Sequence, residues 1–245
     1  MQIVGNGLLG REFKKFISPG LDVLIVASGV SNSLVISDDD CLREEELLSK
    51  LLNKVSCKVL PIYLSSCAIQ AEGVKTKYML HKSKMERLFL SKCDGTIFRL
   101  PQVVGPGANP VQLVPWLFRS TIEGFPVQIQ RGATRNIILA SDVAKISIEL
   151  AKKIIQGEVQ KRSVYIIANT VNLFVPEILC LVESIVGKKA RVSFILDGLA
   201  SLISPSEEQH EIARNLKISF DEKYTERTLQ IYYDWLVMHE SSAKS

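Results

Sequence analysis

The feature that most constrains the fold is a glycine motif at the start of the chain. Residues 1–10 read MQIVGNGLLG, a short apolar strand that leads into Gly5-x-Gly7-x-x-Gly10 and then a helical pattern. In such a motif the first glycine permits a tight turn, the second lets the backbone approach a pyrophosphate, and the third allows close contact between helix and strand. The order of strand, glycine loop and helix therefore predicts a dinucleotide-phosphate site.

Apolar strands and helical patterns alternate along most of the chain. The strands are continuous runs of Val, Ile, Leu and Phe, which is typical of a parallel sheet buried on both faces. The alternation predicts an α/β fold, a Rossmann-type doubly wound parallel sheet with right-handed crossovers. Strands are predicted at Gln2–Val4, Asp22–Ala27, Lys58–Ser65, Thr96–Leu100 and Val164–Ala168, and helices at Leu8–Phe16, Asp38–Lys54, Lys75–Lys92, Gln112–Glu123, Ser141–Ile155 and Val175–Gly187.

Glycine and proline interrupt this pattern in the middle of the chain, between residues 101 and 135. Such punctuation is typical of loops. We predict that residues 1–100 and 136–168 form a dinucleotide-binding core. Residues 101–135 and 169–245 are expected to form a small, mainly C-terminal substrate lobe over the ends of the strands, where ligands bind in open α/β sheets.

The composition is that of an ordinary globular protein. Of the 245 residues, 47% are hydrophobic and 23% are charged, which suits one large domain or a core with a dependent lobe. The net charge of +4 is compatible with anionic small molecules but too weak to indicate nucleic acid. The apolar run Leu21–Ala27 is too short to span a bilayer, and no secretory signal pattern is present, so we expect a cytoplasmic protein that does not enter a membrane.

The cysteines do not indicate a disulfide framework or a metal site. They are odd in number, widely spaced and without a C-x-x-C pair, and the histidines are not near cysteine pairs. Free thiols in a reducing compartment, with no metal, are the simpler interpretation. The cysteines are Cys41, Cys57, Cys67, Cys93 and Cys180, and the histidines are His81, His210 and His239.

The segment between the glycine loop and the next predicted strand is short. Only residues 11–21 separate Gly10 from that strand. The acid that binds the adenosine ribose in such sites, expected about 20 residues beyond the loop, is missing. Asp22 begins a strand and therefore lies at the wrong edge of the sheet. If Asp22–Ala27 were the second strand of the fold, Ser28 at its end would favour a 2′-phosphate.

Several segments, taken in order, resemble the extended short-chain dehydrogenase/reductase family, the NAD-dependent epimerase/dehydratase group that acts on nucleotide sugars. The resemblance covers nearly the whole chain, and the order and spacing of the segments carry it. The matching segments are DVLIVASG (22–29), VLPIYLSSCAIQ (59–70), TIFRLPQVVGPG (96–107), TRNIILASDVAK (134–145) and SVYIIAN (163–169) with the helix after it.

The resemblance explains the short gap. The run at 22–29 matches the fourth strand of the family, so the second and third strands are missing. In the sheet order 3-2-1-4-5-6-7 these two strands form one edge. Their loss leaves a continuous sheet, 1-4-5-6-7, with strand 1 at its side and the adenosine pocket without one wall.

Tyr78 and Lys82 are four residues apart on a predicted helix and therefore share a face. The resemblance implies that Ser66, Tyr78 and Lys82 are catalytic. Tyr78 would act as general acid or base, the charge of Lys82 would favour the phenolate and hold the nicotinamide ribose, and Ser66 would bind the reacting oxygen. A rival register pairs Leu80 with Lys84 and would abolish catalysis; we favour Tyr78. A helix with one core aromatic and one solvated lysine is the plain structural alternative.

The resemblance also implies ligand contacts. Arg135 matches an arginine that meets the nucleotide diphosphate, which suits bidentate contact, whereas Asn136 departs from the usual Asp. For each polar candidate a solvated or locally capping role is the alternative. The implied cofactor-binding residues are Gly5, Gly7, Leu8, Leu9, Gly10, Ala27, Ser28, Gly29, Tyr78, Lys82 and Pro101, and the implied substrate-binding residues are Ser66, Gln102, Asn109 and Arg135.

The implied function is that of an NAD(P)-dependent epimerase or keto-reductase acting on a nucleotide-activated sugar, with NAD or NADP as cofactor, in polysaccharide biosynthesis. Cys67 and Ala68 stand where 4,6-dehydratases of the family carry an Asp-Glu pair, which disfavours dehydration. A homodimer through the helices at 38–54 and 75–92 is common in the family. The alternative is a non-catalytic protein that senses a dinucleotide or binds a partner through its edge strand.

Charged residues elsewhere receive plainer interpretations. The acidic clusters Asp38–Asp40 and Glu44–Glu46 are expected to be solvated helix faces. Arg99 lies within a strand, where it could pair with a carboxylate, and no functional role is assigned to it.

Overall fold

The computed structural model describes residues 1–30, 36–195 and 200–242. The chain forms two compact units. Unit 1 comprises Met1–Pro101, Ala140–Ile167 and Pro205–Ile218, and unit 2 comprises Gln102–Leu139, Ala168–Ser204 and Ser219–Ser245. The sequence-based boundaries differ from these units at residues 101, 136–139, 168 and 205–218. None of the helices in the described part is both long and apolar enough to cross a bilayer.

Unit 1 contains the parallel sheet that the sequence predicts. All neighbouring strands are parallel, and the sheet order is β1-β2-β3-β4-β8. This is the order expected when two strands beyond β1 are missing, so the α/β Rossmann-type fold class is confirmed and β1 is an edge strand of the described sheet. The strands are β1 (Gln2–Val4), β2 (Val23–Val26), β3 (Leu60–Ser66), β4 (Thr96–Leu100) and β8 (Val164–Ile166).

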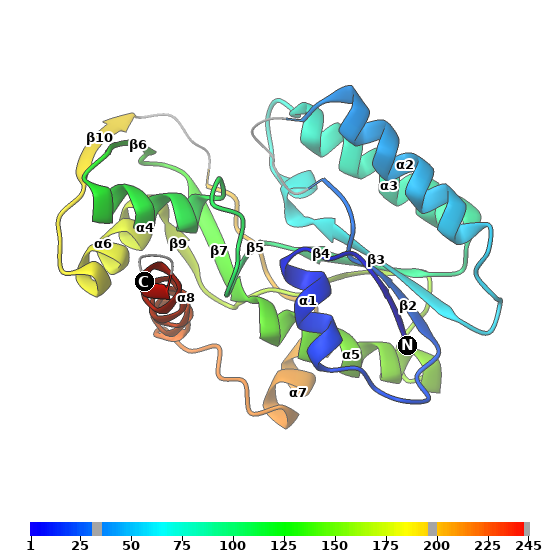
Figure 1. Cartoon of the computed structure of the whole chain (residues 1–245). Helices are drawn as coiled ribbons and strands as arrows, with labels where there is room; N and C mark the ends of the chain where they lie inside the picture. Colours follow the sequence, from blue (N-terminus) through cyan, green and yellow to red (C-terminus); the bar gives the residue numbers. More distant parts are fainter. Residues whose placement is uncertain (31–35, 196–199, 243–245) are drawn as a thin grey trace. The chain divides into compact units, whose positions relative to one another are not determined.

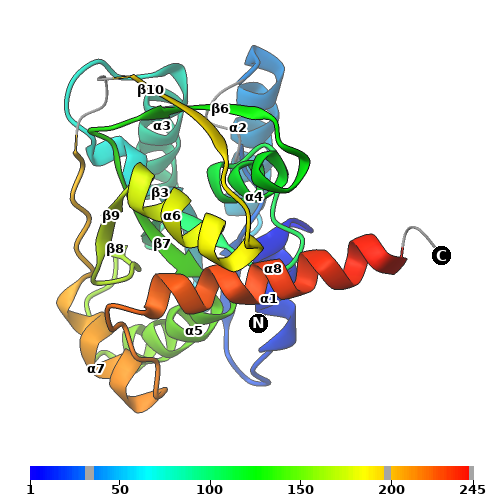
Figure 2. The ribbon, with the colours of Figure 1, turned by 90° about the vertical axis from the view of Figure 1, so that its left-hand side faces the viewer.

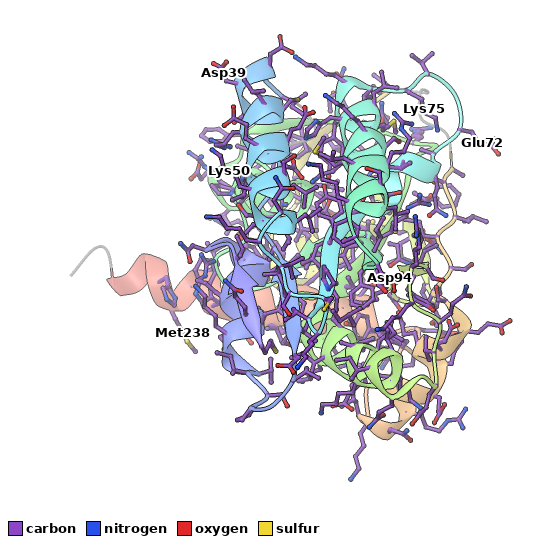
Figure 3. All side chains as sticks on the ribbon, turned by 90° about the vertical axis from the view of Figure 1, so that its right-hand side faces the viewer. Asp39, Lys50, Glu72, Lys75, Asp94 and Met238 are labelled. Atoms are coloured by element: carbon purple, nitrogen blue, oxygen red, sulfur yellow. The ribbon has the colours of Figure 1, made fainter. Side chains whose placement is uncertain are left out.

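Helices cover both faces of this sheet (Figure 1). On one face α1 packs against α5 and α5 against α7, and on the other α2 packs against α3. Figure 3 shows α2 and α3 side by side, with Asp39 and Lys50 on the exposed side of α2. Because both faces are covered, every residue of β2 is buried. The helices are α1 (Leu8–Lys15), α2 (Asp38–Leu52), α3 (Lys77–Lys92), α5 (Ala140–Gln156) and α7 (Glu207–Asn215).

The connection through α1 has an unusual hand. The order β1-β2-β3-β4 steps in one direction, yet α1 lies on one face of the sheet and α2 and α3 on the other (Figure 1). Two strand–helix–strand connections that move in the same direction across a parallel sheet have opposite hands when their helices lie on opposite faces of the sheet. Because about 98% of such crossovers are right-handed, we assign that hand to the α2 and α3 connections. The β1-α1-β2 connection then has the opposite hand, as does the longer path from β4 through α5 to β8. The predicted right-handed rule fails at β1-α1-β2 because the two strands to which α1 would otherwise lead are missing.

The core of unit 1 beneath α2 and α3 is closely packed. Residues from three strands and both helices meet there, and the rings of Tyr63 and Phe89 lie 5.7 Å apart between centroids. Burial of each large apolar side chain contributes roughly 1.5–3 kcal/mol, so this cluster anchors the two helices that carry the candidate site. Its buried members are Leu24, Val26, Leu48, Leu52, Tyr63, Met85, Phe89 and Ile97.

Unit 2 is built on short strands that the sequence analysis does not predict. In one sheet β7 pairs in parallel with β5 and antiparallel with β9, and β6 and β10 form a separate parallel pair. Helix α6 packs against α4 and α8 (Figure 2). The elements are β5 (Gln102–Val104), α4 (Leu113–Glu123), β6 (Pro126–Gln130), β7 (Thr134–Leu139), β9 (Asn172–Phe174), α6 (Val175–Val186), β10 (Arg191–Ile195) and α8 (Tyr224–Ser242).

Two local features stabilise unit 2. Gly124 and Gly187 adopt left-handed conformations and end α4 and α6, as glycine commonly does after a helix. Aromatic residues near the end of the chain also find a partner, since the rings of Tyr232 and Tyr233 lie 5.4 and 5.5 Å from that of Phe118. Helix α8 is thus packed against α4.

Candidate active site

The glycine loop packs closely against the end of β2 and the start of α1. Gly5 has a φ of +129°, and a Cβ there would overlap the carbonyl of Ala27. A Cβ at Gly10 would overlap the carbonyl of Gly5. Two of the three motif glycines are therefore required by the close approach of backbone segments in unit 1.

Gly7 differs from the other two glycines. It has an ordinary extended conformation and is the N-cap of α1 without a side-chain cap, and no described atom lies within 4 Å of a Cβ built there. The first turn of α1, with Leu8 and Leu9, holds no acidic residue. The N-terminal N–H groups of a helix attract anions, so the open space at Gly7 fits a phosphate.

The ends of three adjacent strands bring the other predicted residues of unit 1 to the same edge of the sheet. Ala27, Ser28 and Gly29 follow β2, and Ser66 is the last residue of β3. Pro101 follows β4 and is half-buried. The carboxyl edge of parallel strands is where open α/β sheets bind ligands.

Ser66 has a local structural role. Its Oγ accepts a hydrogen bond from the N–H of Ala68 at 3.2 Å and caps a short 3-10 helix, Cys67–Gln70. No described residue accepts its O–H, which leaves that donor for a ligand. The next residue, Cys67, is buried, and burial raises the pKa of its thiol to about 12, so it is not a nucleophile near neutral pH.

Tyr78 and Lys82 lie on the buried face of α3. Tyr78 is 8% exposed, and its hydroxyl makes no hydrogen bond to another described residue. In the rival register, Leu80 is 58% exposed and Lys84 pairs with Glu45 at 2.6 Å on the outer side of the helix. Only the Tyr78 register presents its two side chains toward the sheet.

Lys82 is held in a buried polar cluster that the sequence analysis does not identify. Its Nζ lies 2.8 Å from Oε1 of Glu44 and donates to the hydroxyl of Tyr63 at 3.2 Å. The Tyr63 hydroxyl in turn donates to Glu44 Oε1 at 2.6 Å, and Nε2 of His81 lies 2.9 Å from Glu44 Oε2. Glu44, Tyr63, His81 and Lys82 are all buried; we call them the Glu44 cluster.

The carboxylate at the centre of the Glu44 cluster is fully satisfied. Besides the three side chains, the N–H of Val30 donates to Glu44 Oε2 at 2.8 Å. Four partners match the roughly four lone-pair sites of a carboxylate. The cluster therefore ties α2, α3 and β3 to the segment after β2, where Gly29 leaves room beside Glu44 and Lys82 for their side chains.

The Glu44 cluster shifts the pKa values of two of its members, Glu44 and Tyr63. Burial alone would raise the pKa of Glu44, but the hydrogen bond with His81, the charge of Lys82 and the hydrogen bonds from Lys82 and Tyr63 outweigh it and lower the pKa to about 2. Burial and the neighbouring Glu44 charge hold the pKa of Tyr63 well above its ordinary value. The cluster thus contains a carboxylate that stays ionised and a phenol that stays protonated.

The sequence held one signal for this cluster. Glu44, Leu48 and Leu52 are spaced at i, i+4 and i+8 and are the buried residues of α2, so Glu44 continues an apolar stripe. The expectation of a solvated face is wrong for Glu44, whereas Glu46 is exposed as predicted.

The expectation of a carboxylate partner for Arg99 is confirmed, since its Nε and Nη2 contact Glu86 at 2.9 and 2.7 Å.

The remaining predicted residues lie in unit 2. Gln102 opens β5 and is half-buried, and exposed Asn109 caps its own loop, since its Oδ1 accepts from the N–H of Val111 at 3.2 Å. Asn136 is buried and pairs with the backbone of Asn169 at 2.7 and 3.0 Å, which is a structural role.

Arg135 is a half-buried cation in unit 2. Its Nη1 donates to the carbonyl of Thr134 at 2.7 Å, and no described carboxylate forms an ion pair with it. Burial lowers its pKa. A half-buried guanidinium without an anionic partner is suited to an anionic ligand.

Comparison with solved structures supports the same fold. RMD from Pseudomonas aeruginosa, complexed with NADPH, aligns with a TM-score of 0.75 at 14% identity over 96% of this chain and 98% of that one. MoeE5 with UDP-glucuronic acid and NAD aligns at 0.69 and 17% identity, over 96% and 85%. UDP-glucuronic acid 4-epimerase from Bacillus cereus, with UDP-glucuronic acid and NAD, aligns at 0.67 and 17% identity, over 96% and 81%.

These neighbours were solved with NADPH or NAD, one of them is an epimerase, and a dTDP-glucose 4,6-dehydratase with NAD also shares the fold. The resemblance found in the sequence is therefore confirmed at the level of fold. No protein-family model matches the chain, and no curated protein matches it in sequence.

Proposed function

We propose that this chain is an NAD(P)-dependent epimerase or keto-reductase acting on a nucleotide-activated sugar. The observation that carries the proposal is the placement in unit 1 of the glycine loop, Ser66, and the α3 face with Tyr78 and Lys82 around one carboxyl edge of a parallel sheet. Neighbours solved with NADPH or NAD support the cofactor class, and neighbours solved with UDP-sugars support the substrate class.

The cofactor would be held by the glycine loop. The uncapped N–H groups of α1 would bind the pyrophosphate beside Gly7, and the backbone of Ala27, Ser28 and Gly29 would line the site at the end of β2. When bound, the nicotinamide supplies the hydride acceptor or donor. The protein would then contribute positioning and proton transfer.

Tyr78 would carry the proton. Its hydroxyl would donate a proton to a sugar carbonyl oxygen as hydride adds to the carbon, which leaves a phenolate. In the reverse direction that phenolate would accept the proton of the sugar hydroxyl as hydride leaves the carbon for the oxidised cofactor. Ser66 would donate its unused O–H to the same oxygen. The positive charge of Lys82 would stabilise the Tyr78 phenolate. The Glu44 cluster holds the Lys82 ammonium in place, but its carboxylate also offsets part of that charge.

Replacing Gly7 by aspartate tests the cofactor loop. An aspartate at the N-cap of α1 should stabilise the fold by only a few tenths of a kcal/mol, because glycine is itself a tolerated N-cap residue, and a Cβ at Gly7 meets open space. Its charge should repel a pyrophosphate and weaken NADH binding by about tenfold or more. Nicotinamide fluorescence titration and thermal unfolding measure the two effects.

Gly7→Ser is the matched control, because serine caps the helix without a charge. It should share the gain in stability and lose much less affinity than the aspartate variant. Equal NADH affinity in Gly7→Asp and wild type would place the dinucleotide elsewhere and remove the support for the proposed function.

Replacing Arg135 by methionine tests the nucleotide-sugar substrate. Loss of charge-assisted contacts to a diphosphate should raise KM for a UDP-sugar by about tenfold to a hundredfold. Stability should hold or improve, because the guanidinium is half-buried without a carboxylate partner. Arg131→Met, whose guanidinium lies 4.6 Å over the Phe194 ring, is the control in the same unit. An unchanged KM in Arg135→Met would assign the diphosphate to other residues.

A second candidate is a non-catalytic protein that binds a dinucleotide as a sensor. The pairing of Lys82 with Glu44 favours it, since a lysine whose charge is matched by a buried carboxylate stabilises a phenolate less well. Binding of NADH without turnover on any nucleotide sugar would support this candidate over the enzyme.

A further inference from the structure

The proposed cofactor loop lies beside an incomplete edge of the unit 1 sheet. β1 pairs with β2 only, and no other described strand adjoins it. In complete dinucleotide folds a strand on that side ends in an acid that binds the adenosine ribose. Asp22 cannot replace that acid, because it precedes β2 and so lies at the amino edge of the sheet.

The groups that do stand beside the loop are cationic. Lys14 donates to Oδ1 of Asn6 at 2.8 Å, and Arg11 donates to the Asn6 carbonyl at 3.2 Å. Both side chains are exposed. Glu12, the one acid of α1, is buried and paired with Lys15 at 2.6 Å. The loop and α1 thus offer positive charge without a carboxylate to select a ribose hydroxyl.

We propose that this chain binds its nicotinamide dinucleotide from the pyrophosphate to the nicotinamide and selects neither the base nor the ribose hydroxyls of the adenosine half. This inference rests on the proposed function for the presence of the dinucleotide. A changed base should then alter affinity little, because no described strand lies beyond β1 to supply a wall for that half. A 2′-phosphate should be accepted, because Arg11 and Lys14 attract it and no acid on α1 repels it.

Exposure limits how much these cations contribute. Exposed charge pairs contribute roughly 0–1 kcal/mol and are screened by salt. NADPH should therefore bind somewhat more tightly than NADH at low salt, and the difference should disappear as the salt concentration rises.

The test is a fluorescence titration of the full chain with three reduced dinucleotides: NADH, its hypoxanthine analogue and NADPH. The analogue should bind within about threefold of NADH, and NADPH up to about fivefold more tightly than NADH at low salt. Lys14→Gln should reduce only the NADPH advantage. Lys92→Gln, an exposed lysine at the end of α3, should leave all three affinities unchanged.

The outcomes separate this inference from the proposed function. An analogue or NADPH that binds at least about tenfold more weakly than NADH would show that the adenosine half is read and overturn the inference, while the cofactor proposal stands. If none of the three dinucleotides binds, the cofactor proposal fails, and this inference fails with it.

Discussion

Replacing Glu44 by glutamine is expected to destabilise the protein by about 3–5 kcal/mol, the usual cost of leaving a buried charge without its partner. Lys82 would lose the carboxylate 2.8 Å from its Nζ. The single NH2 group of the glutamine would replace one carboxylate oxygen and so face either Lys82 and Tyr63, which donate to Oε1, or the N–H of Val30, which donates to Oε2. Denaturant unfolding of both proteins near neutral pH measures the difference in the free energy of unfolding.

Two further variants identify the cause. Glu46→Gln makes the same change at an exposed position of α2, where the pair with Lys50 is 3.5 Å long, and it should change stability by less than about 0.5 kcal/mol. Adding Lys82→Met to Glu44→Gln should restore part of the loss, because the uncompensated cation is then removed. If the double variant is no more stable than Glu44→Gln, the uncompensated charge is not the cause.

The same cluster predicts an acid dependence. Because the pKa of Glu44 is lowered from its ordinary 4.5 to about 2, its contribution is fully present above pH 4.5 and is lost as the pH falls toward 2. That contribution is on the order of 3 kcal/mol. The gap in stability between wild type and Glu44→Gln should therefore narrow over this pH range. A gap that stays constant from pH 6 to pH 2.5 would contradict the low pKa.

Replacing Tyr78 by phenylalanine is expected to lower kcat by about 10²–10⁴-fold, the usual contribution of a general acid or base. NADH affinity and stability should change little, since no described residue is hydrogen-bonded to the Tyr78 hydroxyl. The assay is the change in nicotinamide absorbance with a nucleotide sugar under single-turnover conditions. A lower kcat with unchanged NADH affinity would distinguish a proton donor from a residue that only packs in the site.

Two other tyrosines serve as controls for this variant. Tyr165 lies in β8, and its hydroxyl donates to the carbonyl of Gln160 at 2.7 Å. The Tyr165→Phe variant should keep the turnover of the wild type. Tyr63→Phe removes a member of the Glu44 cluster and should lose stability instead. Full turnover in Tyr78→Phe would exclude Tyr78 as the proton donor.

The fold of unit 1 could be predicted from the sequence because its determinants are local. Continuous apolar runs define the strands, and the short path from Gly10 to Val23 leaves no room for two more strands. Unit 2 was harder, since β5 and β9 have three residues each and lie among loop-forming residues. Their pairing with β7 depends on contacts between distant segments, which no local pattern reports.

The candidate site divides in the same way. The glycine loop, Ser66 and Tyr78 follow from motifs, and the structure brings their strand ends to one edge. The environment of Lys82 does not follow, because Glu44 reaches it from a helix 38 residues earlier in the chain. An acidic run such as Glu44–Glu46 reads as solvated unless the apolar stripe through Leu48 and Leu52 is weighed against it.

The opposite hand of the β1-α1-β2 connection bears on the order in which the molecule can be assembled. Helix α1 packs against α5, and its Phe13 is fully buried. Because α5 begins at Ala140, the first hundred residues include β1 and α1 but not the surface that covers them. The segment with β1 and α1, which is synthesised before α5, is therefore among the last parts of unit 1 that can be completed, and the glycine loop that it carries depends on a helix from later in the chain.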